Sequence, residues 1–334
     1  AKTDTIPVMN EKASSLSFYK KGAWALHTLR EDIGAKNFQK IVKKYLKKHQ
    51  YKNVITDEFL AEVKKVVKTF DAENFKKTWL ETSGFDMVLA ESYLVKNKSV
   101  AAYIQLTKEK KDLENYKAIL ESETYFPIKQ YIFYKLANTP FEDKKELIEI
   151  GMKQNLYVRQ AIAETVTKIP VEFKSQYETF LDDASYNTKE IALINLCKNF
   201  PEDKKNYLMK TKNIIGNNDK SFRISWLSLD FLSDDDGYEK YLILQELLDF
   251  SSERYESSIR QNALEVLLKL APDDYFVIAS LFRATTHHKW QFTKFSRDII
   301  REKLKNSEFR NRVEELAKTA DEKTAALYMK FLKE

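Results

Sequence analysis

The residues of this chain that could do chemistry are few, and Tyr19 is the first of them in sequence. The positions after it follow helical spacing up to Gly34, which is placed to end the helix as a C-terminal cap. These positions are Ala23, Leu26, Leu29, Arg30 and Ile33. The pattern predicts a helix that begins just after Tyr19, with a phenol at the helix start that can point outward rather than into the bundle. The alternative is a packing role, because an aromatic residue beside a helix start usually belongs to the core or to a hydrophobic staple.

The chain contains four histidines, His27, His49, His287 and His288, and none of them begins a His-Glu-x-x-His pattern. That pattern places two imidazoles on one face of a helix, where they bind zinc, with a glutamate between them as the general base. The sequence therefore predicts that this chain alone holds no catalytic zinc. Its single cysteine, Cys197, excludes an internal disulfide and lies in an apolar run, so we expect a small buried thiol.

Three further polar patterns favour structural interpretations. The adjacent His287 and His288 would point to different faces of a helix, which favours an interhelical loop over a chelating pair. The Asp-Asp-Asp-Gly run at 234–237 lacks the alternating acids of a calcium loop and predicts a turn with a helix N-cap. A basic residue recurs near the start of successive helices, which predicts a structural ladder that pairs with acids or carbonyls of the neighbouring repeat; its members are Arg159, Arg223 and Arg260.

The composition indicates a helical protein that neither binds nucleic acid nor spans a membrane. Its 56 basic and 50 acidic residues give a net charge of +6, and the two signs are interleaved as on the solvated faces of helices. Nucleic-acid binding would need a basic stripe or patch instead. Only 6 glycines and 6 prolines interrupt the chain, which favours helices with few turns. No apolar run approaches the roughly 18 residues of a membrane span, and no signal peptide is recognisable at the start.

Hydrophobic periodicity predicts a small helical bundle in residues 16–86, after a polar, extended lead-in over residues 1–15. Beyond Gly84 the pattern stays helical, and no strand pattern is recognisable between residues 85 and 125. Six helices are expected: one beginning near Tyr19, one over 36–48, one with Thr56 as its N-cap, and three over 72–81, 88–94 and 100–106.

A weak internal repeat runs from about residue 110 to the end. Its segments end before a proline or an acidic turn, and the prolines at 140, 170, 201 and 272 are spaced by 30, 31 and 71 residues. A helix pair cannot bury its apolar face alone, so successive pairs must stack, as HEAT repeats do. The segments are 129–140, 159–170, 189–201, 223–233 and 260–272, with helices over 295–304, 308–318 and 322–333 as a cap. The predicted fold class is all-α: a small helical bundle followed by a HEAT/armadillo-like α-solenoid.

The residues around Tyr19 also form a motif. Tyr-x-Lys-Gly-Ala at 19–23 is followed by an apolar helix and by Leu-Arg-x-x-Ile-Gly-x-x-x-Phe at 29–38. Further anchors follow in order at 45–49, 51–59, 70–71, 75 and 79–80. This ordered set resembles the M1 family of zinc aminopeptidases (gluzincins) over roughly residues 16–86. The resemblance implies two domains: residues 1–86 as the C-terminal part of the catalytic domain, and residues 87–334 as a helical repeat domain.

The same resemblance implies a role for Tyr19. In that family, the tyrosine of this motif donates a hydrogen bond to the oxyanion formed when zinc-bound water attacks the peptide carbonyl. The family's His-Glu-x-x-His pair, its third zinc-ligand glutamate and its Gly-x-Met-Glu-Asn substrate loop precede this tyrosine, and this chain lacks all three. We therefore expect no cofactor in this chain, zinc in a longer parent, and no hydrolysis by the chain alone.

A basic residue of the C-terminal helices holds the far carboxylate of the substrate in some M1 enzymes, which makes Lys289, Lys294 and Arg297 candidates here. The expected ligand of the parent is a peptide. An alternative is a non-catalytic helical-repeat scaffold that binds proteins, although a generic scaffold has no reason to contain the ordered motif. The sequence leaves the oligomeric state, the compartment and the side-chain preference open.

Overall fold

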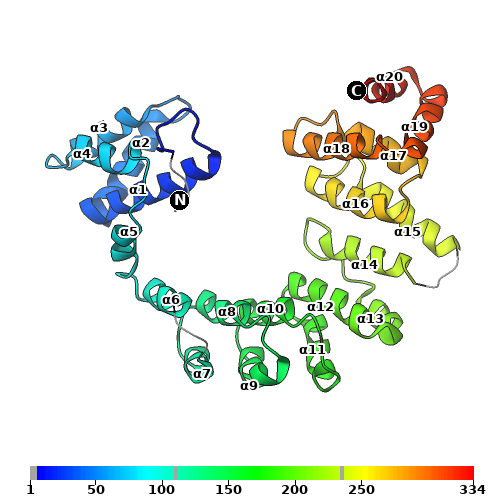
Figure 1. Cartoon of the computed structure of the whole chain (residues 1–334), viewed down its shortest axis with the longest axis horizontal. Coiled ribbons are helices and arrows are strands. Elements are labelled where there is room, and N and C mark those ends of the chain that lie inside the picture. The colour runs from blue at the N-terminus through cyan, green and yellow to red at the C-terminus, as the bar shows by residue number, and fades with distance from the viewer. Residues whose placement is uncertain (1–5, 109–111, 234–236) are drawn as a thin grey trace. The chain divides into compact units, whose positions relative to one another are not determined.

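The computed structural model describes residues 6–108, 112–233 and 237–334, and within these ranges the chain is all-α, without a strand (Figure 1). The predicted fold class is confirmed. The chain divides into two compact units, Ala1–Lys111 and Asp112–Glu334. In the described residues no helix is both long and apolar enough to cross a bilayer. The expected family boundary at 86/87 stays a prediction.

The first unit contains the helices that periodicity predicts. The first four helices share one hydrophobic core. Leu29, Ile41, Val63 and Phe75, one from each helix, are buried in it. Burying such side chains is worth about 1.5–3 kcal/mol each. The elements are α1 (Ser15–Ile33), α2 (Ala35–His49), α3 (Thr56–Val66), α4 (Ala72–Phe75) with a π-helical turn over Lys76–Leu80, α5 (Met87–Leu94) and α6 (Lys98–Lys108).

Two predicted helix starts are wrong, and in both places capping chemistry explains the difference. Helix α1 begins at Ser15, one turn before Tyr19, because the Ser14 hydroxyl caps it by accepting from the Ser17 N–H at 3.1 Å. Thr56 is the first helical residue of α3 rather than its cap. The Glu58 carboxylate accepts from the Ile55 N–H at 3.0 Å instead, so an acid three positions along satisfies the helix start.

The second unit is a stack of helices. The even-numbered helices α8, α10, α12, α14, α16 and α18 contact one another in succession, and five of them coincide with the repeat segments seen in the sequence. The elements are α7 (Leu113–Glu121), α8 (Phe126–Lys135), α9 (Phe141–Met152), α10 (Leu156–Thr165), α11 (Lys174–Glu178), α12 (Tyr186–Asn199), α13 (Lys204–Thr211), α14 (Ser221–Phe231), α15 (Gly237–Phe250), α16 (Ser257–Leu270), α17 (Tyr275–Ala284), α18 (Trp290–Lys303), α19 (Ser307–Thr319) and α20 (Glu322–Leu332).

The predicted basic ladder is confirmed. Arg159 donates to the Gln154 carbonyl at 2.6 Å and to Asp183 at 2.5 Å, and Arg223 donates to the Lys212 carbonyl and to both oxygens of Glu246. Arg260 donates to the Ser251 carbonyl at 3.2 Å. Each accepting carbonyl lies just past the end of the preceding helix, where the backbone lacks an intrahelical donor. The ladder therefore ties α10, α14 and α16 to the ends of α9, α13 and α15, the helices that precede them in the chain.

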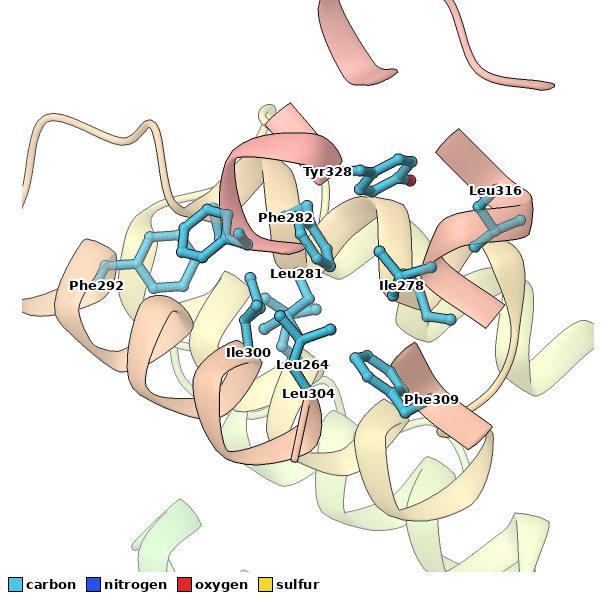
Figure 2. Packing of buried hydrophobic residues seen from close by; sticks show 13 residues of the cluster. Leu264, Ile278, Leu281, Phe282, Phe292, Ile300, Leu304, Phe309, Leu316 and Tyr328 are labelled. Atoms are coloured by element: carbon cyan, nitrogen blue, oxygen red, sulfur yellow. The ribbon is translucent and has the colours of Figure 1, made fainter. Parts of the chain in front are cut away.

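The last helices close the stack around a separate hydrophobic core (Figure 2). Phe282 lies at its centre, with its ring edge-on to Tyr328 at 4.7 Å and to Phe331 at 5.6 Å. Ring pairs at this geometry add about 0.5–1.5 kcal/mol to the burial term. The three expected terminal helices are confirmed as α18, α19 and α20, with α18 starting at Trp290 rather than at residue 295.

Candidate functional site

Tyr19 lies in the second turn of α1 and is exposed to 72%. Its ring contacts the ring of Phe18 edge-on at 5.8 Å, and its phenol makes no hydrogen bond with any residue that the structure describes. Within the described residues Tyr19 is therefore not part of the hydrophobic core. Its hydroxyl is free to donate to a molecule outside the chain.

Helix α1 orients Tyr19 by burying its other face. Lys21 is two positions after Tyr19, which places it on the opposite side of the helix. It is 4% exposed and donates to the Ile6 carbonyl at 2.7 Å. Ala25 and Leu29 pack into the core of the unit. With this face fixed, the phenol must point away from the bundle.

The outward face of α1 is apolar as well. Leu16 is 60% exposed and Leu26 is 45% exposed, and with Tyr19 they form a stripe at spacings of three and seven residues. A helix that is apolar on two faces is normally covered on both. We call Leu16, Tyr19 and Leu26 the α1 stripe. Sequence reasoning missed it, although the apolar residues beyond one helical face were its signal.

His27 belongs to an aromatic cluster beside this stripe. Its ring lies 5.6 Å from that of Trp24 and 6.5 Å from that of Tyr93, and its buried Nε2 has no hydrogen-bond partner within the described residues. The Tyr93 hydroxyl donates to Asp32 at 3.0 Å. Burial, followed by this hydrogen bond, raises the pKa of Tyr93. A phenol of raised pKa stays neutral, so the cluster supplies packing and a donor rather than an anion.

The residues that the structure describes do not fit a zinc site. Over the described ranges, no three His, Cys, Asp or Glu side chains are grouped as metal ligands. His287 and His288 lie in the loop before α18 with their rings stacked at 4.2 Å, and the His287 Nδ1 accepts from the Lys289 N–H. The predicted loop is confirmed. The 234–236 part of the predicted acidic turn lies outside the described residues.

The three basic candidates each have a partner inside the second unit. Lys289 contacts Glu256 at 3.1 Å, Lys294 pairs with Asp298 on the same helix, and Arg297 donates to the Thr285 carbonyl at 3.2 Å. These contacts engage each cation structurally and do not join the three around one ligand. Their role as substrate contacts stays a prediction.

Cys197 is buried, as expected, with 6% of its surface exposed. Burial raises the pKa of its thiol to about 11, and Lys204 opposes this shift. A neutral thiol is a poor nucleophile, so burial leaves Cys197 as the small buried thiol that the sequence predicts.

Comparison with known proteins relates one part of the chain to peptidases. Residues 9–79 match the Peptidase family M1 domain. Aminopeptidase N of Lactococcus lactis subsp. lactis is 34% identical over 83 residues, a stretch that covers 25% of this chain and 10% of that relative. No solved structure matches the chain. The segment that holds α1 to α4, the α1 stripe and Tyr19 is therefore similar to the M1 peptidases.

Proposed function

We propose that this chain is the C-terminal part of an M1 zinc aminopeptidase, a hydrolase that removes N-terminal residues from peptides. The observation that supports this most is Tyr19: an exposed phenol whose hydroxyl has no hydrogen-bond partner among the described residues, at the motif position, inside the segment that matches the M1 domain. In the parent, Tyr19 would donate a hydrogen bond to the oxyanion that develops on the scissile carbonyl.

The α1 stripe supports the view that more protein covers this unit. Two leucines and a tyrosine that stay 45–72% exposed on one helix face are an unfavourable surface in water. The preceding part of the catalytic domain would bury this face and bring Tyr19 to the edge of the active site. A catalytic zinc would have to be bound by residues outside this chain, since the described residues offer no such ligand set.

The helical stack of the second unit would restrict the parent to short peptides by limiting access to the active site. This part of the proposal rests on the family resemblance. The alternative is a non-catalytic scaffold, favoured by the extent of the stack, which makes up the whole second unit and lies outside the matched segment.

The test is Tyr19→Phe in the longer protein, measured as hydrolysis of an aminoacyl arylamide. We expect kcat to fall by about 10²–10³-fold, because one oxyanion donor contributes that much, with KM changed little. The melting temperature should not change, since the phenol makes no hydrogen bond with the described residues.

The matched control is Tyr51→Phe, since Tyr51 is fully exposed in the same matched segment. This variant should keep wild-type kcat. The proposal would be overturned by a Tyr19→Phe enzyme with undiminished kcat, or by hydrolysis of the arylamide by the isolated 334-residue chain.

A further inference from the structure

We propose that a groove in the second unit, between α13 and α15, docks an amphipathic helix whose flank toward α13 is acidic. The groove has a volume of about 1120 Å³ and is lined by residues of α12, α13, α14 and α15. It lies outside the segment similar to M1 peptidases. The inference is therefore independent of the proposed function and would hold for a scaffold as well.

The floor of the groove is apolar and well packed. Leu208, Trp226, Leu227 and Ile243 line it, and each of them is at most 6% exposed. The Trp226 indole donates to the Leu208 carbonyl at 3.0 Å, so its orientation is fixed. A fixed apolar floor can receive side chains from a partner without first reorganising.

The rims of the groove are also apolar, but they are open to solvent. Ile194 on α12 is 39% exposed, Met209 on α13 is 66% exposed and Leu242 on α15 is 48% exposed. The groove is larger than the roughly 300–1,000 Å³ of small-molecule sites. A helix laid between two helices, with its apolar face on the floor and rims, matches this size and chemistry.

Charge decides which flank of the partner faces α13. Four lysines line the groove there, and none of them forms an ion pair with a residue that the structure describes. They are Lys198, Lys204, Lys205 and Lys212, accompanied by a single acid, Glu202. An unpaired cationic wall favours carboxylates on the approaching partner.

The acids of the opposite wall are already engaged. Glu246 forms a bidentate pair with Arg223 at 2.7 Å, and Asp230 and Glu239 also have partners. The neighbouring run 234–236 is not part of the described lining. Among the described lining residues, the charges without an ion pair are the four lysines and Glu202, so a partner meets a net positive wall there. Helix-in-groove docking with this asymmetry selects an acidic flank on the α13 side.

The test uses the whole chain and a fluorescein-labelled synthetic peptide of about 18 residues, or five helical turns. Leucines at i, i+3, i+4 and i+7 form its apolar face, and glutamates fill one flank. A second peptide has lysines in place of the glutamates. Fluorescence anisotropy should give micromolar binding of the acidic peptide and at least about tenfold weaker binding of the basic one, with the difference shrinking at high salt.

Groove variants locate the site. Met209→Glu and the pair Lys204→Glu/Lys205→Glu should each weaken binding of the acidic peptide by about tenfold or more. Met329→Glu and Lys323→Glu, both on α20 and away from the lining, are the matched controls and should leave binding unchanged. Circular dichroism melts of all variants should overlay, because Met209 and Lys205 are exposed.

Three results would overturn the inference. The two peptides could bind equally, the groove variants could bind like the controls, or the chain could self-associate through this face. In the last case, analytical ultracentrifugation would show a dimer that Met209→Glu dissociates, and the occupant would be a second copy. Tyr19→Phe should not affect binding of the acidic peptide. Failure of the groove proposal therefore leaves the proposed peptidase function standing, and failure of that function leaves the groove proposal standing.

Discussion

Gly151 and Gly22 both lie inside helices, but their surroundings differ. A Cβ at Gly151 would come within 2.5 Å of the Phe133 Cζ and 2.7 Å of the Ile162 Cδ1, both from buried residues, whereas a Cβ at Gly22 would meet nothing within 4 Å. We expect Gly151→Ala to destabilise the second unit by about 1–3 kcal/mol through overpacking. Gly22→Ala should stabilise the first unit by about 0.5–1 kcal/mol through helix propensity.

Urea unfolding, followed by circular dichroism, measures the change in the free energy of unfolding for each of the two variants. Equal effects of the two substitutions would show that helix propensity, rather than the contacts of Gly151, governs both positions.

Single residues of the site show what could be predicted from the sequence. Tyr19 was found from its motif and Gly34 from its place after an apolar run, since both signals are local. The exposure of Tyr19 was not decided by sequence, because an aromatic beside a helix start has a packing alternative. The error of one turn in the start of α1 came from passing over Ser14, whose hydroxyl is the actual cap.

Helices α2 and α3 are joined by charge as well as by apolar contact. Glu62 on α3 accepts from Lys48 on α2 at 2.5 Å and from Lys65 at 2.8 Å. The hydrogen bond from Lys48, then that from Lys65, lowers the pKa of Glu62 from 4.5 to about 2. A carboxylate whose pKa is lower in the folded state stabilises the fold above its unfolded pKa, and loses that contribution as pH falls through its folded pKa.

We therefore expect the stability advantage of wild type over Glu62→Gln to be constant above about pH 5 and to vanish between about pH 4.5 and 2. Urea unfolding at a series of pH values, followed by tryptophan fluorescence, measures that difference. Glu315→Gln is the control, because its contact with Arg312 is exposed and long, at 3.6 Å. A Glu62→Gln difference that does not change with pH would contradict the lowered pKa.

The sequence was most informative about the positions of the helices. Helix periodicity located all six helices of the first unit, and the recurring proline spacing located the stacked helices of the second. The basic ladder was predictable because its residues recur at the repeat period. The groove was not, since Ile194, Met209 and Leu242 come from three different helices and are neighbours only in the folded chain.

For the molecule as a whole, we expect residues 112–334 to fold without the first unit. This unit is compact and contains the core around Phe282, which is built only from residues of α16 to α20. The fragment should show a helical spectrum and one cooperative thermal transition, because stacked repeats gain stability from their neighbours. A fragment that lacks a cooperative transition or binds a hydrophobic dye would contradict this prediction.

The limit between the two compact units has no local signal in the sequence, and the family-derived domain limit stays a prediction. Helices α5 and α6 belong to the first unit, so the division falls at 111/112, beyond the family-derived domain limit at 86. Helices flank either point among the described residues: the π-helical turn Lys76–Leu80 and α5 around residue 86, and α6 and α7 around residue 111. A composition shift, which usually marks such a division, is therefore missing from the sequence.

Gly34 is both the last cap of α1 and the first cap of α2, with φ +81° and ψ 146°. Its side is open to solvent and a Cβ would touch nothing, yet any L-residue there is strained by about 1–3 kcal/mol. In a map of mutational tolerance, this position would therefore look like a buried core residue. The constraint is one of handedness rather than space: the single achiral amino acid is the one that joins these two helices without strain.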